Sequence, residues 1–455
     1  MPHNYLPQVR SQYEALPYPP CNPQDDHQRL VKTWLEDLPM INHYCFAGKQ
    51  SFQNGFRALV AGGGTGDATI FLAEQLRATD AEIVHLDMSQ ASIALAQERA
   101  QIRGLSNIRW VHDSLLNLPG LGLGRFDYIN CSGVLHHLAD PDLGLKALRS
   151  VLKNDGAHPA AIGLMVYAST GRTGVYQMQA LMRLVNAAGS ADGAPSGEAL
   201  DAQRKIANTR DLLASLPPSN WFMRSEELHH DHKAGDAGIY DLLLHSQDRS
   251  YSVGELFDWL GDGAGGAGGH GLHLIFTDVQ RGRSPYLPHM VLGRKPPAMA
   301  AALRQLPRRQ QYAMAELMIG DITTHSLYLT RDAACTAPYG NADYVPFFFH
   351  EPLTGEIAAQ VFNSNRGQPF VLQHQHSGVS VAVNPGKYGA KILRLIDGQR
   401  SFGEIFEQFR ADWKGQAAAP DDAALFADFA ESYDTLNALD RLLLRHRETG
   451  VFAAR

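Results

Sequence analysis

The sequence lacks several features that would assign a protein to a special class at once. It has four cysteines among 455 residues, and Cys21, Cys45, Cys131 and Cys335 show no C-x-x-C spacing, so they predict neither a zinc ribbon nor a disulfide framework. No apolar run approaches the roughly 18 residues of a membrane helix, and the first residues lack the regions of a signal peptide. We therefore expect a cytoplasmic protein that does not bind membranes.

An excess of positive charge is also missing. The 40 lysines and arginines are outnumbered by 47 acidic residues, and the formal net charge of −7 provides no general attraction to phosphate backbones or anionic lipid. We therefore expect no nucleic-acid partner. No regular internal repeat is evident, and a chain of 455 residues is long enough for two or three domains.

The most informative stretch is FRALVAGGGTGD, from Phe56 to Asp67. It predicts a buried strand at Ala58 to Ala61, a glycine turn from Gly62 to Gly66, and then a helix. Glycine suits this turn because a positive φ and the close approach of a ligand both disfavour a Cβ, and the helix that follows directs free N–H groups into the same space. Asp87 ends the next strand at the spacing expected of an acid that binds ribose, so the pattern predicts a nucleotide site.

A dinucleotide site fits less well. Counted from Gly62, the G-x-G-x-x-G pattern places Gly64 correctly but puts Asp67 where the third glycine belongs. Strands are predicted to follow at Ile108 to Asp113, Phe126 to Cys131 and Ala161 to Tyr167, with a helix from Leu143 to Leu152. This alternation is typical of an α/β fold.

In combination, GGGTG, strand-end Asp87, Asp113 with Ser114, and FDYINCSGVLHHLADP from Phe126 resemble the class I S-adenosylmethionine-dependent methyltransferases over roughly residues 56–167. The resemblance implies a doubly wound, Rossmann-like sheet and S-adenosylmethionine as cofactor. It also implies that the glycine turn passes under the methionine part, Asp87 holds the ribose, Asp113 and Ser114 flank the adenine, and Cys131 to Gly133 lie beside the sulfonium. The implied cofactor residues are Ala61, Gly62, Gly63, Gly64, Gly66, Asp87, Met88, Asp113, Ser114, Cys131 and Ser132.

The chain departs from this family at one position. The family usually has an acid two residues before the first glycine, where this chain has Val60, so the methionine amino group must be held from elsewhere. The departure leaves open a non-catalytic binding or regulatory protein that retains the fold.

Additions to the sheet are predicted before and within the methyltransferase domain. Residues 1–55 form an extension that serves either as a lid over the cleft or as a surface brace, with Tyr13, Tyr18, His43 and Tyr44 able to face a substrate. The methyltransferase domain is expected to span 56–295, with a helical insertion at about 170–249 over the active site. Leu272 to Thr277 and His289 to Arg294 are predicted as its last two strands.

Further elements are predicted after the sheet. Residues 296–370 form a linking region that opens with one helix, Met299 to Met318, and 371–455 form a small α+β domain that resembles winged-helix peptide-binding modules. The whole layout is similar to bacterial methyltransferases with a regulatory domain, some of which modify lysine. A protein or peptide methyltransferase that docks its substrate on the C-terminal module is therefore an alternative to one with a small-molecule acceptor. The oligomeric state, with a homodimer as one option, stays open.

Methyl transfer is an in-line displacement, so the enzyme has to align a nucleophile at about 3 Å and, where needed, remove its proton. His136 and His137 follow the fourth strand, where one of them could act as a base or orient the substrate, or could simply be bonded to the backbone. His136 and His245 are the predicted catalytic residues. Tyr18, Trp221, Asp241 and Arg249 are predicted to bind the substrate. Asp241, His245 and Arg249 are four residues apart and would share one helix face, either as a site for a carboxylate or phosphate or as a salt-bridge ladder.

A short histidine-rich run, His229 to His232, contains residue types that bind zinc. Adjacent side chains point in different directions, however, and no second cluster has ligand spacing. We therefore predict a solvated loop there and no metal site.

Overall fold

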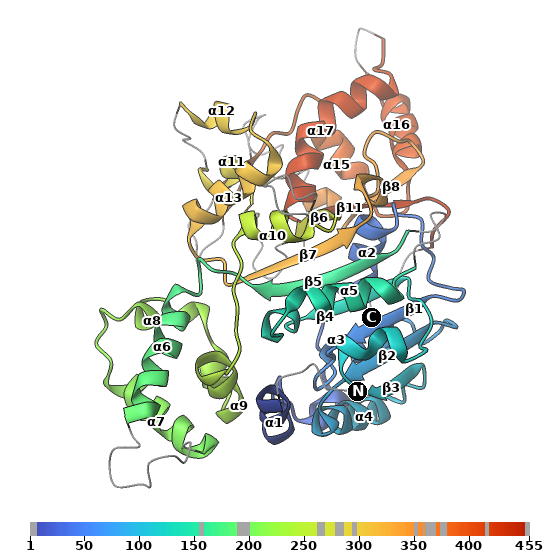
Figure 1. The fold of residues 1–455 in the computed structure, drawn as a ribbon. Coiled ribbons are helices and arrows are strands. Elements are labelled where there is room, and N and C mark those ends of the chain that lie inside the picture. The colour runs from blue at the N-terminus through green and yellow to red at the C-terminus, as the bar shows by residue number, and fades with distance from the viewer. Residues whose placement is uncertain are drawn as a thin grey trace.

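The structure is a computed structural model that describes residues 7–153, 159–188, 201–261, 269–277, 286–293, 298–349, 354–357, 360, 370–373, 380–414 and 418–450. Its centre is a seven-stranded sheet of order β3-β2-β1-β4-β5-β7-β6 (Figure 1). Five strands are parallel: β1 (Arg57–Ala61), β2 (Glu82–Asp87), β3 (Ile108–His112), β4 (Tyr128–Ser132) and β5 (Ala161–Tyr167). The remaining two, β7 (Thr324–Thr330) and β6 (His273–Thr277), are antiparallel. The predicted α/β fold is confirmed.

Strand β1 has neighbours on both sides, β2 and β4, and the chain order reverses at this point. Open α/β sheets bind ligands in the crevice at the carboxyl ends of the strands beside such a reversal. Helices α3 (Asp67–Gln75), α4 (Gln90–Arg103), α5 (Pro141–Val151) and α10 (Val253–Leu260) flank the sheet. The fold therefore directs the glycine turn after β1 into this crevice.

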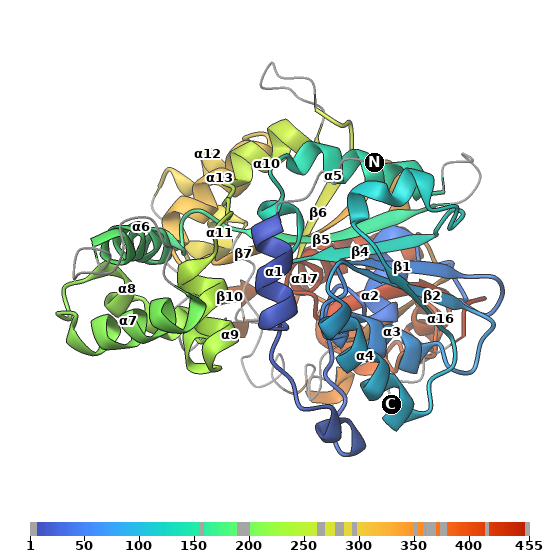
Figure 2. The same cartoon turned by 60° about the horizontal axis from the view of Figure 1, so that its bottom comes forward.

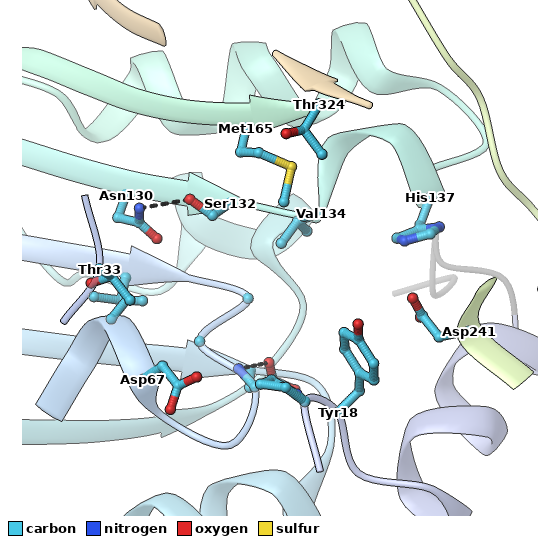
Figure 3. Close-up of a pocket in the computed structure, with 18 of the residues that line it drawn as sticks. Tyr18, Thr33, Asp67, Asn130, Ser132, Val134, His137, Met165, Asp241 and Thr324 are labelled. Atoms are coloured by element: carbon cyan, nitrogen blue, oxygen red, sulfur yellow. Dashed lines mark hydrogen bonds between the residues drawn. The ribbon is translucent and has the colours of Figure 1, made fainter. Parts of the chain in front are cut away.

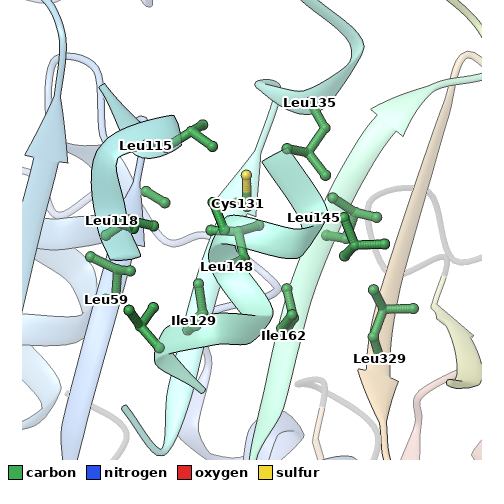
Figure 4. Close-up of a cluster of buried hydrophobic side chains, with 14 of the residues drawn as sticks. Leu59, Leu115, Leu118, Ile129, Cys131, Leu135, Leu145, Leu148, Ile162 and Leu329 are labelled. Carbon is green, nitrogen blue, oxygen red and sulfur yellow. The ribbon is translucent and has the colours of Figure 1, made fainter. Parts of the chain in front are cut away.

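The two faces of the sheet have separate cores because side chains alternate along each strand. On one face Leu59, Ile129 and Ile162 pack with Leu145 and Leu148 of α5 (Figure 4). On the other face, strand residues such as Val60 and Tyr128 pack against Met40 and Ile41 of α2 (Leu38–Cys45). Burial on both faces explains why the parallel strands read as nearly continuous apolar runs.

The predicted last strand at His289 to Arg294 is wrong for residues 289–293, and Arg294 lies outside the described residues. This stretch overlaps the short helix α11 (Pro288–Val291), whose first turn contains Pro288, a residue suited to that position. The strand predicted at Leu272 to Thr277 is confirmed as β6, but its partner is β7, which comes after the predicted domain end at residue 295. The single helix predicted from Met299 to Met318 is also wrong, because Pro307 separates α12 (Ala300–Leu303) from α13 (Arg308–Ile319).

The N-terminal extension is divided between two sites. Helix α1 (Pro7–Ala15) lies between the sheet domain and the insertion (Figure 2), and a 3₁₀ turn, η1 (Pro23–His27), packs on α4. Helix α2 is buried between the sheet and the C-terminal region, where Nδ1 of His43 lies 3.1 Å from the carbonyl oxygen of Leu444. His43 and Tyr44 therefore contact the C-terminal region and not a substrate.

The helical insertion forms a lobe beside the sheet (Figure 1). Its core includes Val175, Met178, Phe222 and Leu242. Its helices are α6 (Thr173–Ala188), α7 (Ala202–Ser215), α8 (Trp221–Arg224) and α9 (Asp236–Ile239), with a π-helical turn, η7 (Tyr240–Leu244), after α9. In the described part of the chain, no helix combines the length and apolar character needed to cross a bilayer.

The C-terminal region contains helices α15 (Gly389–Leu395), α16 (Phe402–Ala411) and α17 (Asp422–Ala438), and the hairpin of β9 (Phe370–Gln373) and β10 (Ser380–Val383). Strand β8 (Tyr344–Phe348) pairs with β11 (Leu442–His446), so the predicted division at residue 371 separates two strands of one sheet. Ser401 and Glu404 form a reciprocal capping box at the start of α16. The similarity to winged-helix modules stays a prediction.

Candidate active site

A cavity of about 780 Å³ extends from the glycine turn to the helical insertion (Figure 3). Pockets for drug-sized ligands are roughly 300–1,000 Å³, so this one has room for a nucleoside cofactor together with a small acceptor. Its walls come from the N-terminal segment before α2, the carboxyl ends of the parallel strands, the start of β7 and the insertion. We call the part around the glycine turn the cofactor end, and the part around Tyr13, His137 and Asp241 the acceptor end.

The glycine turn leaves a space that side chains at these positions would occupy. Gly62, Gly64 and Gly66 have φ of 75°, 51° and 102°, in the left-handed region that favours glycine. A Cβ on Gly64 would lie 2.6 Å from the carbonyl oxygen of Tyr18. The N–H of Gly64 donates to Oδ2 of Asp87 at 2.8 Å, and the N–H of Ser89 donates to Oδ1 at 2.8 Å. Burial raises the pKa of Asp87 despite these bonds.

Most of the cofactor residues predicted from the sequence line the cavity. They are Gly62, Gly63, Gly64, Asp87, Met88, Asp113, Ser114 and Ser132. Ala61 and Cys131 are fully buried in the core beneath it, and Gly66 is the N-cap of α3. The two-residue period of β4 explains the case of Cys131, since its neighbours Asn130 and Ser132 line the cavity while Cys131 points to the opposite face.

A buried acid that the sequence analysis missed lies at the cofactor end. Glu36 is 2% exposed, lines the cavity beside Val60 and Asn130, and accepts a hydrogen bond from Nδ2 of Asn130. Val60 lies on the sheet face against which the neighbouring Leu35 packs. The acid that the family has at position 60 would therefore reach the same side of the sheet as Glu36.

Glu36 fits the amino group of the cofactor on charge as well as position. In the described ranges no lysine or arginine forms an ion pair with it, and burial raises the pKa of its carboxyl to about 7. A buried carboxylate is costly without a cation, and the methionine part of S-adenosylmethionine carries an ammonium. Glu36 would hold that group, Asp87 the ribose, and Asp113 with Ser114 the adenine. A signal for Glu36 was the missing acid at Val60, but its location in the extension could not be derived from the sequence.

Three side chains lie close together near the acceptor end: His137 and Asp241, which line the cavity, and His245, which does not. Asp241 accepts hydrogen bonds from the hydroxyls of Tyr13 at 2.9 Å and Tyr167 at 3.2 Å. Nδ1 of His245 accepts from the N–H of Gln247 at 3.1 Å, so its ring proton belongs on Nε2, 3.3 Å from the Tyr13 oxygen. A chain of polar contacts thus joins His245, Tyr13, Asp241 and Tyr167.

His137 faces the cavity from the turn after β4, opposite Asp241 (Figure 3). Its Nδ1 lies 2.9 Å from the carbonyl oxygen of Gln247 and must donate the hydrogen, so its Nε2 carries a lone pair. Burial lowers the pKa of His137 to about 4 and that of His245 to about 3, so both rings are neutral at pH 7. His137 is therefore a hydrogen-bond acceptor throughout the physiological pH range.

The same three residues are also a possible ligand set for a cation, because their ligand atoms lie within 4.8 Å of one another. Two imidazoles and one carboxylate suit several transition metals. Both nitrogens of His245 already have polar contacts, however, and a cation would have to displace the proton on its Nε2. The sequence predicts no metal site, and it does not indicate this cluster because His137 lies about 100 residues before Asp241 and His245.

Two predictions near this cluster need correction. His136 is fully buried, stacks on Tyr167 with ring centroids 3.8 Å apart, and does not line the cavity. The 3₁₀ turn η3 (Leu135–His137) directs successive side chains about a third of a turn apart, so the cavity receives His137. The helix predicted to align Asp241, His245 and Arg249 ends at Leu244, and Arg249 is exposed outside the cavity with its guanidinium over Tyr251.

Of the other predicted residues, some line the cavity and some do not. Tyr18 and Asp241 line the acceptor end, whereas Trp221 is 56% exposed on α8 and does not. The loop predicted to be solvated at His229 to His232 is solvated in part. His230 is exposed, whereas His229 is buried with Nε2 3.1 Å from the carbonyl oxygen of Gly171. His229, His230 and Asp231 line the cavity.

Comparison with known proteins identifies the family. Residues 59–158 match the family model described as a methyltransferase domain. An uncharacterised protein of Synechococcus sp. is 32% identical over 334 residues, which cover 73% of each chain. Demethylmenaquinone methyltransferase of Geobacillus kaustophilus is 31% identical over 154 residues, 34% of this chain and 59% of that protein.

A solved structure extends the likeness over most of the chain. PKMT2 from Rickettsia typhi gives a TM-score of 0.57 at 14% identity, with 90% of this chain and 75% of that chain covered. The structure of PKMT2 in complex with AdoHcy gives 0.54 at 15% identity, with 88% and 74% covered. At this identity the likeness concerns the fold alone.

A glycine cradle, a strand-end acid and a crevice at the reversal of the strand order define a nucleotide-binding enzyme fold, and the matches identify its class. The chain belongs to the class I S-adenosylmethionine-dependent methyltransferases. S-adenosylmethionine is its cofactor, and the predicted family, fold and cofactor are confirmed. The family assignment favours the enzyme over the non-catalytic and dinucleotide-dependent alternatives.

Proposed function

We propose that this methyltransferase acts on an amine nitrogen of a small-molecule acceptor that binds at the acceptor end of the cavity. The observation that carries the proposal is the continuity of one cavity from the glycine turn to His137 and Asp241. The lining of the acceptor end by Tyr13, Tyr18 and Asp241 favours a cationic or strongly polar group.

Each side chain has a separate part in this proposal. Asp241, with a formal negative charge, attracts the ammonium form of the acceptor, and burial in the cavity favours loss of its extra proton. Nε2 of His137 accepts a hydrogen bond from the neutral amine, which turns the nitrogen lone pair away from the ring. S-adenosylmethionine supplies an electrophilic methyl group. The nitrogen lone pair forms the new C–N bond while the C–S bond breaks toward sulfur, and the surplus proton on nitrogen leaves to water.

A lysine side chain of a protein or peptide is the second candidate acceptor. Three tyrosines, Tyr13, Tyr18 and Tyr167, line the cavity near Asp241, and aromatic rings around a carboxylate suit an alkylammonium. The lysine side chain would enter the cavity from solvent, while the backbone of the substrate peptide stayed at the surface of the enzyme. This candidate therefore predicts activity on long peptides that free amines do not reproduce.

The test is methyl transfer from isotopically labelled S-adenosylmethionine to two panels, free small amines and lysine peptides. Transfer to the free amines supports the first candidate, and transfer to peptides alone supports the second. In either case His137→Phe should lower kcat on the order of 100-fold, because misalignment of a nucleophile has that cost. His137→Gln, which retains an acceptor oxygen, should recover part of it. Equal rates for wild type and His137→Phe would contradict the assigned role of His137.

A further inference from the structure

A buried arginine lies at the acceptor end and has no part in the function proposed above. Arg172 follows β5 just before α6, is 3% exposed and lines the cavity. An arginine is charged at every physiological pH, and a buried charge is costly unless it is paired. The groups that surround the Arg172 guanidinium therefore show which kind of ligand it is suited to bind.

The protein satisfies only part of this guanidinium. Its face covers the ring of Tyr167, with Cζ 3.5 Å from the ring centroid. Nη2 lies 3.6 Å from Oδ2 of Asp248, which is longer than a hydrogen bond. That carboxylate is already bound by the hydroxyl of Tyr176 at 3.3 Å and Nε2 of Gln179 at 2.8 Å.

Two nitrogens of Arg172 are left without a hydrogen-bond partner among the described residues. Among the described residues, neither Nε nor Nη2 has a hydrogen-bond acceptor, although both are buried. These two nitrogens form one edge of the guanidinium plane and direct two parallel N–H bonds to the same side. That edge matches the two oxygens of a carboxylate.

A second charge lies beside the same tyrosine. Tyr167 has the guanidinium of Arg172 over its ring, while its hydroxyl donates to Asp241 at 3.2 Å. The Arg172 guanidinium and the Asp241 carboxylate thus contact different parts of the Tyr167 side chain. In the described ranges they form no ion pair with each other. A ligand with the opposite arrangement of charges, a carboxylate and an amine a few bonds apart, would complement both.

We propose that Arg172 binds a carboxylate of the acceptor, so that the substrate is a small amino acid or a related amino carboxylate. The carboxylate accepts the Nε–H and Nη2–H bonds, and the amine faces Asp241 and His137. This inference rests on the proposed function, because it assigns the acceptor of the same site. It also separates the two candidates, since a lysine within a peptide carries no carboxylate next to its ammonium.

The test uses a probe that requires no turnover. Benzoate and its neutral isostere benzamide are added to the full chain saturated with S-adenosylhomocysteine, and binding is followed by saturation-transfer NMR. We expect benzoate to bind wild type at least tenfold more tightly than benzamide, and Arg172→Met to abolish this preference. Arg249→Met removes an exposed arginine outside the cavity and should retain it. Equal binding of the two probes to wild type would overturn the proposal.

Stability and activity provide two further controls. Arg172→Met leaves Asp248 buried beside a lost cation, so the double variant with Asp248→Asn is prepared as well, and Arg172→Lys retains the charge without the two-pronged edge. Both should bind S-adenosylhomocysteine as wild type does. The double variant should lack the preference for benzoate, and Arg172→Lys should show a smaller preference than wild type. In the amine panel, an amino carboxylate should exceed its carboxamide at least tenfold in kcat/KM. A panel without any turnover, together with selective benzoate binding, would reject the proposed amine chemistry and leave the carboxylate site standing.

Discussion

Replacement of Glu36 by glutamine tests the cofactor end most directly. The pKa of this carboxyl is raised by burial from its ordinary value near 4.5 to about 7. A raised pKa in the native state means that the native state retains a proton that the unfolded state has lost. Stability therefore falls as pH rises from 4.5 to 7, by about 3 kcal/mol on the scale of 1.36 kcal/mol per pKa unit. Without ligand, Glu36→Gln should be more stable than wild type at pH 8 by an amount of this order.

The same substitution should weaken cofactor binding. A charge-assisted hydrogen bond contributes about 1.5–3 kcal/mol, so loss of the bond to the ammonium predicts an affinity about 10- to 150-fold lower at pH 8. In wild type Glu36 must ionise before it can pair, so affinity should fall up to tenfold for each pH unit below 7 and level off above it. The variant should lose the part of this dependence that comes from Glu36.

The assay is calorimetric titration with S-adenosylhomocysteine, which carries the same amino group but no transferable methyl, between pH 5.5 and 8.5. Asp37→Asn is the matched control, because Asp37 is the next residue, its pKa is also raised to about 7 by burial, and it does not line the cavity. We expect Asp37→Asn to bind as wild type does. Unchanged affinity in Glu36→Gln would refute the assignment of Glu36 to the amino group.

Three further variants test other parts of the structure. Gly64→Val should abolish S-adenosylhomocysteine binding in the same titration, because φ is 51° and a Cβ there would lie 2.6 Å from the Tyr18 carbonyl oxygen. Asp87→Ala should weaken binding by roughly 1.5–3 kcal/mol for each ribose hydrogen bond lost, and wild-type affinity in this variant would show that the ribose lies elsewhere. Leu148→Ala, at a fully buried position of α5, should cost about 2–5 kcal/mol in urea unfolding, with cofactor affinity retained.

The sequence predicted best those features whose residues lie close together in the chain or at successive strand ends. The glycine turn, Asp87 and the strand ends belong to one contiguous pattern, because a parallel sheet brings successive strand ends to one edge. Capping boxes such as Ser401 with Glu404 could be predicted for the same reason, since both partners lie within one turn. Alternation along a strand would have corrected one choice, Cys131, in favour of Asn130.

Long-range placement explains what the sequence could not predict. Glu36 reaches the cofactor end because the segment before α2 runs along the sheet face of Val60, and nothing near Glu36 in the sequence indicates that contact. The π-helical turn at Tyr240–Leu244 interrupts the regular helix that was expected to align Asp241 with Arg249. The final strand was misplaced because a short apolar run, His289 to Leu292, satisfies both strand and helix patterns, while its pairing partner is decided by the whole sheet.

The cavity walls come from separate parts of the chain, and this affects how the acceptor of such an enzyme can change in evolution. The matched family region ends at residue 158, whereas Arg172 and Asp241, which line the cavity, lie after it. Mutation in the segments after this region can exchange one acceptor for another while the strand ends and the glycine turn of the cofactor end are inherited unchanged. Relatives that align only with the shared core therefore inform us mainly about the donor, and the acceptor residues of the insertion have to be compared separately.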